Sequence, residues 1–179
     1  MEEQDWATVG HLVDEACIEL WRSLGASTQP SGEDPLGTMD HAIVAAIGFG
    51  GDDLRGSVTL AATREFVRAT HPATVRGETP SEADLLDWCS ELANQLLGRL
   101  KNKLLSYGVM LFLSTPSAVV GADVRLHPQS GVPGGSLRAY RVDERSIVVS
   151  WTGEANRPLS LGAPRPRQDD VQESVMLEF

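Results

Sequence analysis

Apolar residues recur every three or four positions in two long stretches of the chain, which predicts two amphipathic helices. The first stretch covers residues 9–24 and ends at Gly25, a residue type that commonly terminates helices. The second covers residues 85–104, and the helix is expected to end near Ser106, just before Gly108. The apolar positions of this second stretch are Leu85, Cys89, Leu92, Ala93, Leu96, Leu97, Leu100 and Leu104.

The start of the second helix is predicted from a capping box. Thr79 stands where a capping residue would, Pro80 at the first helical position and Glu82 at the third. A threonine and a glutamate in this arrangement satisfy two of the free backbone N–H groups at a helix start. We therefore expect a helix from about residue 80 to about residue 106.

Between the two long helices, the pattern changes to short runs rich in β-branched residues. Residues 41–48 and 54–62 predict two antiparallel strands. The turn between them, residues 49–53, contains two glycines and is expected to supply the positive φ angles of a hairpin. A short helix over residues 64–70, capped by Thr63, is predicted to follow.

Four more apolar runs predict strands after the second long helix: residues 109–113, 118–126, 137–142 and 147–151. Hairpins segregated from the helices, without regular alternation of strand and helix, indicate an α+β fold. Residues 26–39 are interpreted as an exposed connection.

The length of 179 residues suits one domain, expected over residues 1–152. Residues 153–179 are predicted to form a proline-rich tail whose last five residues either dock as an edge strand or fray.

Composition and charge narrow the classes of function. The chain is 41% hydrophobic and 22% charged, and no apolar run is long enough to cross a bilayer. Its formal net charge of −10 repels polyphosphate, which argues against general nucleic-acid binding. The first residues include acids where a secretory signal would be basic, so a cytoplasmic location is expected.

The two cysteines, Cys17 and Cys89, both fall within apolar helical patterns, and we interpret them as small buried hydrophobes. A disulfide between them would require the two positions to be adjacent in space, and two cysteines cannot by themselves complete a four-ligand zinc site. The four histidines are scattered singly. No metal cluster, nucleophile motif or phosphate-binding glycine loop is therefore predicted.

The side of the second helix opposite its apolar face carries a strip of six residues spaced three or four apart. The strip residues are Asp87, Glu91, Asn94, Gly98, Lys101 and Asn102. The solvent-exposed side of an amphipathic helix without any binding role shows the same pattern. However, asparagine and glycine are poor helix formers. Gly98, one turn beyond Asn94, would let a partner's backbone approach, or else would admit another helix of the same protein.

Several of these residues occur in an order that resembles the CheC/CheX-type chemotaxis phosphatases, specifically the single-motif CheX branch. Asp87, Glu91 and Asn94 are similar to the family's helical signature, followed by Gly98 and Lys101. Downstream, Pro116 and Gly121 are similar to a later motif, and residues 47–58 resemble a glycine-marked hairpin. The resemblance covers residues 5–151.

This resemblance implies a phosphatase that hydrolyses the aspartyl-phosphate of a CheY-like receiver domain in a response regulator. It implies that Asn94 orients the attacking water and that Glu91 docks the receiver. Asp87, Gly98 and Lys101 are expected to complete the binding surface. The enzyme would hold no cofactor of its own, and Mg²⁺ would belong to the partner receiver. By likeness to the family, a homodimer joined through sheet edges is also expected.

Two other functions remain compatible with the sequence. The same helix could serve a non-catalytic receiver-binding or adaptor module in two-component signalling. Alternatively, the strip could simply face water in a structural or oligomeric protein. Dephosphorylation above the spontaneous rate separates the first hypothesis from the second, and recovery of a receiver as partner separates both from the third.

Overall fold

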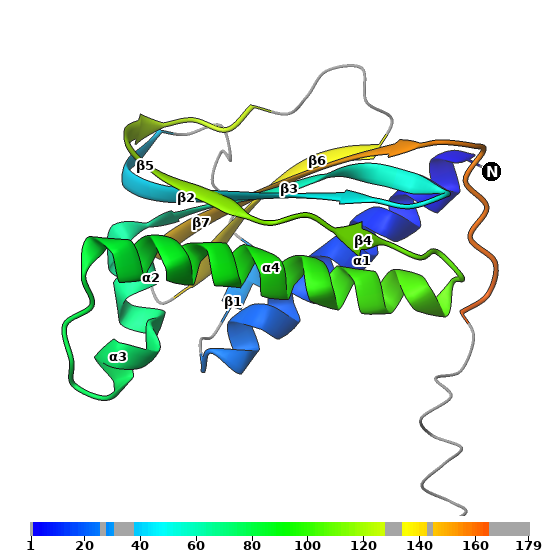
Figure 1. Ribbon diagram of the computed structural model, residues 1–179. Helices are drawn as coiled ribbons and strands as arrows, with labels where there is room; N and C mark the ends of the chain where they lie inside the picture. Colours follow the sequence, from blue (N-terminus) through cyan, green and yellow to red (C-terminus); the bar gives the residue numbers. More distant parts are fainter. Residues whose placement is uncertain (1, 26–27, 31–37, 128–133, 143–144, 165–179) are drawn as a thin grey trace, which may run out of the picture.

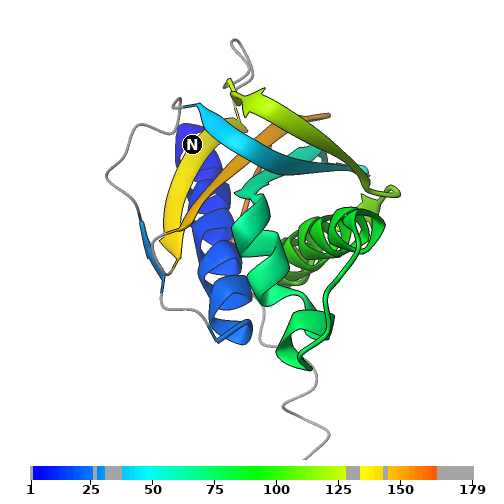
Figure 2. The same cartoon turned by 90° about the vertical axis from the view of Figure 1, so that its left-hand side faces the viewer.

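An antiparallel sheet forms one layer of the protein and the helices form the other (Figures 1 and 2). The computed structural model describes residues 2–25, 28–30, 38–127, 134–142 and 145–164. The described helices are α1 (Glu2–Ser23), α2 (Arg64–Thr70), α3 (Pro72–Val75) and α4 (Glu82–Ser106). The described strands are β1 (Thr28–Pro30), β2 (Met39–Gly50), β3 (Leu54–Thr63), β4 (Phe112–Leu113), β5 (Ser117–Val124), β6 (Gly134–Val142) and β7 (Arg145–Ala155).

The sheet order is β1-β6-β7-β3-β2, and β4 and β5 both pair with the outer edge of β2. The longer helices α1 and α4 lie on one face of this sheet (Figure 2). The main core fills the space between them and the sheet, because the apolar stripes of both helices face the alternate inward residues of the strands. The predicted α+β architecture is confirmed.

Aromatic side chains occupy the centre of this core. Trp21 of α1 makes an edge-on contact with Phe66 of α2, with ring centroids 5.7 Å apart. Trp151 of β7 stacks on Phe49 of β2 at 6.4 Å. These ring contacts join α1 to α2 and β7 to β2, and all four residues belong to one core cluster, so the sheet and the helices form a single packed unit.

The capping box of α4 lies two residues later than the sequence predicted. Ser81 is the cap, and its hydroxyl accepts a hydrogen bond from the Asp84 backbone N–H at 3.2 Å. The Asp84 carboxylate in turn accepts one from the Ser81 backbone N–H at 2.8 Å. Glu82, predicted to close the box, pairs instead with Arg64 of α2 at 3.1 Å. Because serine and aspartate offer the same reciprocal bonds, the box shifts to them and Glu82 is released.

The two glycines of the first hairpin do not adopt the positive φ angles that were predicted. Among the described glycines, positive φ occurs at Gly25, Gly77 and Gly108. Gly51 serves another purpose, because a Cβ placed on it would lie 2.1 Å from the Met110 carbonyl oxygen. The glycine is required there by close approach of the backbone that leads from α4 into β4.

Two other predictions about strands are corrected. The run 109–113 contributes only Phe112–Leu113 to the sheet, while Val109 and Leu111 are buried in the core without strand pairing among the described residues. The predicted connection 26–39 contains a strand, β1, which pairs with residues 140–142 of β6. Three residues are too few for a periodic pattern, so β1 cannot be recognised from the spacing of apolar residues.

The chain beyond residue 152 continues in the fold as far as it is described. β7 runs to Ala155, Leu159 is buried, and the Leu161 backbone N–H donates to the Asp5 carboxylate at 3.1 Å. The predicted boundary at residue 152 therefore falls inside a strand. The expected edge strand over residues 175–179 lies outside the described residues.

Candidate functional site

The predicted site lies on α4, whose orientation is fixed by its buried face. All eight apolar positions that predicted the helix are buried: Leu85, Cys89, Leu92, Ala93, Leu96, Leu97, Leu100 and Leu104. This face packs on β2 and on α1. With 3.6 residues per turn, the remaining positions are distributed over two flanks and one outer side.

One flank of α4 is bound to the neighbouring helices. The Lys103 ammonium donates to Glu15 and Glu19 of α1 at 3.0 and 2.7 Å. Burial by itself would lower the pKa of Lys103, but its hydrogen bonds to Glu19 and Glu15 outweigh burial and raise that pKa. Nearer the start of α4, the Trp88 indole N–H donates to Thr70 of α2 at 3.1 Å. This flank has a structural role.

The outer side of α4 holds the six residues predicted from the sequence. Asp87, Glu91 and Asn102 are exposed. Asn94, Gly98 and Lys101 are half-buried. The six therefore line one accessible strip, as expected from their spacing. Their roles remain predictions.

Asn94 differs from most polar side chains of the long helices in forming no hydrogen bond with any described residue. Within the described part of the chain, its carboxamide takes part in no hydrogen bond. A primary amide offers two donors and one acceptor oxygen without changing its protonation. Asn94 therefore presents its full hydrogen-bonding capacity to whatever binds the strip.

Glu91 does have a partner. Its Oε1 accepts a hydrogen bond from Gln95 Nε2 at 2.9 Å, across one turn of α4. Gln95 is not part of the predicted strip, although its position four residues after Glu91 places it within hydrogen-bonding reach of that side chain. The contact uses one oxygen of the carboxylate.

Gly98 leaves open space on the strip because it has no side chain. A Cβ built on it would meet no atom within 4 Å outside its own turn of helix. Packing among the described residues therefore does not require glycine at this position, and none of the described helices packs closely against Gly98. The open space above it is accessible from outside the protein.

Charge is unevenly distributed along α4. The first three turns carry the acids Glu82, Asp84, Asp87 and Glu91, whereas Arg99, Lys101 and Lys103 lie in the second half. This arrangement suits the helix dipole. At the helix start, the Ser81 hydroxyl and backbone N–H lower the pKa of the Asp84 carboxyl by hydrogen bonding to its charged form.

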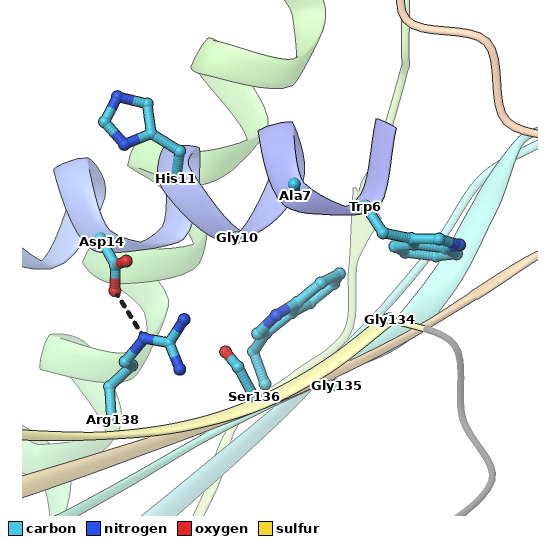
Figure 3. A pocket seen from close by; sticks show the side chains of 10 residues that line it. Trp6, Ala7, Gly10, His11, Asp14, Gly134, Gly135, Ser136 and Arg138 are labelled. Carbon is cyan, nitrogen blue, oxygen red and sulfur yellow. Dashed lines mark hydrogen bonds and ion pairs between the residues drawn. The ribbon is translucent and has the colours of Figure 1, made fainter. Parts of the chain in front are cut away.

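A hollow of about 340 Å³ lies elsewhere, between α1 and the start of β6 (Figure 3). Trp6, Gly10 and Gly134 are among its walls. Its opposite charges bind each other, because Arg138 Nε donates to Asp14 at 3.2 Å. None of the predicted site residues lines it, and its charged groups are already paired, so it is not the site that the sequence indicated.

Cys17 and Cys89 are buried free thiols, as interpreted from the sequence. Burial raises the pKa of each thiol to about 12. Neither therefore forms a reactive thiolate near neutral pH. In the part of the chain that the structure describes, no group of three or more metal-ligating side chains comes together, and no helix is long and apolar enough to span a membrane.

Solved structures share this fold at low sequence identity. A CheX chemotaxis protein from Vibrio vulnificus is 16% identical with a TM-score of 0.64, over 80% of this chain and 93% of that one. A CheX protein from Desulfovibrio desulfuricans is 16% identical with a TM-score of 0.65, over 82% of this chain and 99% of that one. A CheX–CheY complex with BeF₃ and Mg²⁺ from Borrelia burgdorferi matches at 13% identity and a TM-score of 0.60, over 80% and 96%.

No curated protein sequence matches the chain. The family model for chemotaxis phosphatase CheX, however, matches residues 43–138, which is more than half of the chain and includes the whole of α4. The mixed helix and antiparallel-sheet fold agrees with the resemblance drawn from the sequence. This chain belongs to the CheX family of chemotaxis phosphatases.

Proposed function

We propose that this protein hydrolyses the aspartyl-phosphate of a CheY-like receiver domain, and that the receiver docks on the outer strip of α4. The observation that carries the proposal is an unpartnered carboxamide, Asn94, on the accessible side of the helix that the CheX family model covers. The Borrelia complex contains CheY, which supports a receiver as the class of partner.

The chemistry asks little of the phosphatase. An acyl phosphate is already reactive, and hydrolysis requires a water molecule in line with the bond to be broken. We propose that the receiver supplies the Mg²⁺ that neutralises charge on the phosphoryl oxygens. The phosphatase then contributes orientation of water and stabilisation of developing charge.

Asn94 is proposed to orient that water. Its amide oxygen accepts a hydrogen bond from the water, while its NH₂ group donates to a phosphoryl oxygen. Asn94 is half-buried, and its carboxamide forms no hydrogen bond with any described residue, so it is available to the receiver. The open space above Gly98, one turn later, allows the receiver backbone to come close.

Glu91 is proposed to bind a cation of the receiver beside the phosphorylated aspartate. It lies less than one turn before Asn94, and its second carboxylate oxygen is bonded to no other described residue. Asp87 adds negative charge one turn earlier, and Lys101 offers a cation to the other end of the partner. Charges placed this way fix the orientation of docking more than they raise affinity.

The test is phosphate release from a panel of phosphorylated receivers. Asn94→Ala is expected to lower kcat by about tenfold or more while binding to a beryllofluoride-activated receiver is retained. Asn102→Ala is the matched control, because it removes the same side chain from an exposed position two turns further along α4, at the far end of the strip, and Asn102 itself is not proposed to contact the receiver. It should keep wild-type kcat.

Equal rates for Asn94→Ala and the wild type would contradict the proposed role of Asn94. A wild-type protein that binds the receiver, yet never raises dephosphorylation above the spontaneous rate, would favour the adaptor function over the enzyme. Failure to bind any receiver in either phosphorylation state would leave the strip as plain surface.

We also propose a homodimer formed through β5. β5 pairs with β2 on one side, and its other side has no strand partner among the described residues. Val119 and Val120 on this strand are 61% and 40% exposed, although valine usually packs in a sheet. Val119→Lys should shift the wild-type dimer to monomer in light scattering. A monomeric wild type would contradict this assembly.

A further inference from the structure

We propose that Gln95 is a positioning residue that sets the Glu91 carboxylate in the orientation needed to dock a receiver. This inference rests on the proposed function, and it assigns a role to a residue outside the sequence motif. Gln95 need not touch the receiver. It acts on Glu91 through the hydrogen bond of 2.9 Å between Gln95 Nε2 and Glu91 Oε1.

The first reason is the charge next to Glu91. Asp87 lies four residues earlier on the same strip, so its carboxylate and that of Glu91 repel each other across one turn. The Gln95 amide lies one turn on the opposite side and attracts Glu91 by donating to it. The two neighbours therefore act in the same direction and bias the Glu91 side chain toward the second half of α4, where Asn94 and Gly98 lie.

The second reason is that the turn containing Gln95 is fixed from outside α4. Arg99 NH1 donates to the Gln95 backbone carbonyl at 3.3 Å. Arg99 NH2 donates to the Ser23 hydroxyl at 3.0 Å, and that hydroxyl donates to the Leu20 carbonyl of α1 at 2.7 Å. A continuous set of hydrogen bonds therefore connects the end of α1 to the backbone of the residue that holds Glu91.

The third reason is the division of the carboxylate oxygens. Gln95 takes Oε1 and, within the residues described, Oε2 has no partner. A glutamate held by one oxygen offers the other in a restricted set of directions. Ordering a free glutamate during docking would cost entropy, and a side chain already ordered avoids most of that cost. The expected consequence is a lower KM with kcat unchanged.

The central experiment separates KM from kcat on a phosphorylated receiver. Gln95→Ala should raise KM by about two- to tenfold, the range expected for losing the order of one flexible side chain, and leave kcat at wild-type level. Gln95→Glu should raise KM at least as much, because it replaces the donor with a third carboxylate. Gln95→Lys should restore a near wild-type KM, because it returns a donor at the same spacing.

A double-mutant cycle tests whether Gln95 acts through Glu91. In a Glu91→Ala background, Gln95→Ala should have no further effect on KM. A KM effect that persists in that background means direct contact of Gln95 with the receiver and overturns the inference. Unchanged KM in Gln95→Ala alone overturns it as well. Circular dichroism melting should show the same midpoint for all Gln95 variants.

A measurement without any receiver distinguishes this inference from the proposed function. In NMR spectra, the Gln95 side-chain amide resonances of the wild type should differ from those of Glu91→Ala, because that variant removes the hydrogen-bond acceptor. They should be unchanged in Asp87→Asn. Wild-type amide resonances equal to those of Glu91→Ala overturn the inference alone. A wild-type protein that shows the expected difference, but neither binds nor dephosphorylates receivers, overturns the proposed function, and with it a docking role for Gln95.

Discussion

The two long helices cover the same face of the sheet and bury similar apolar stripes. Their polar side chains differ in whether they form bonds within the protein. On α1, Asp5 binds the backbone at Leu161, and Asp14 binds Arg138 and Tyr140. On the outer strip of α4, Asn94 has no bond with any described residue. Amphipathic pattern alone does not separate these cases.

This contrast between α1 and α4 indicates which surface of the domain is free to bind a partner. α1 has a hollow beside it, but the charged groups there are occupied by one another. On the strip of α4, by contrast, the Asn94 side chain forms no hydrogen bond with any described residue. Hydrogen-bonding capacity left unused on a rigid element is a better guide to the site than concavity when the partner is another protein.

The largest effects should come from the buried faces, where the two helices are alike. Leu20→Ala on α1 and Leu96→Ala on α4 each truncate a fully buried side chain. Each should lower the free energy of unfolding by about 2–5 kcal/mol in urea or thermal denaturation. A much smaller loss at one site would mean that its helix packs less firmly than the other.

A smaller effect should distinguish the polar sides. Among the described residues, Asp14→Ala leaves the Tyr140 hydroxyl with the weak Cys17 sulfur as partner, and it removes the carboxylate that pairs with Arg138. We expect a loss of about 1–2 kcal/mol in urea denaturation. Asp87→Ala, an equivalent change on the strip of α4, should stay within about 0.5 kcal/mol. Equal losses of stability at the two positions would contradict the view that Asp14 has a structural role that Asp87 lacks.

The start of α4 provides a pH-dependent prediction. Ser81→Ala removes the cap and should cost about 1 kcal/mol near neutral pH. Hydrogen bonds lower the pKa of Asp84 in the folded state, so its stabilising contribution is present above the ordinary carboxyl pKa of about 4 and is lost as pH falls below it. The stability gap between wild type and Ser81→Ala should therefore narrow on acidification. A gap that widens below pH 4 would contradict the capping box.

The smallest effect is expected at Gly98, and it has the opposite sign. Gly98→Ala should stabilise α4 by about 0.5–1 kcal/mol, because the site has open space and alanine favours helix. Gly98→Phe should fold equally well but raise KM for a receiver, because its ring fills the space that the partner requires. Wild-type KM in Gly98→Phe would place the receiver elsewhere.

Much of the fold was predictable because long periodic patterns survive tertiary packing. The buried face of α4 and its end near Ser106 follow directly from the spacing of leucines and from Gly108. The position of the capping box was not predictable from the sequence. Both Thr79 with Glu82 and Ser81 with Asp84 satisfy the same local rule. In the structure Glu82 pairs instead with Arg64, eighteen residues earlier, a contact that no local rule indicates.

The candidate site divides in the same way. Spacing alone places Glu91, Asn94 and Gly98 on one strip, because residues three and four apart share a face. The hydrogen bonds from Gln95 to Ser23 run through Arg99, and Arg99 and Ser23 are 76 residues apart in the chain. No local pattern predicts this contact. The reason for glycine at position 51 likewise depends on a distant carbonyl, that of Met110.

Because α4 is one uninterrupted helix, the separation between Glu91 and Asn94 is a fixed length of about 4.5 Å along its axis. No loop between them can stretch to fit a different partner. One inserted alanine would turn everything beyond it by about 100° and carry Asn94 off the strip. The proposed docking therefore requires a receiver whose cation and phosphorylated aspartate are separated by a distance that matches the one between Glu91 and Asn94. Recognition then depends on this distance as much as on charge.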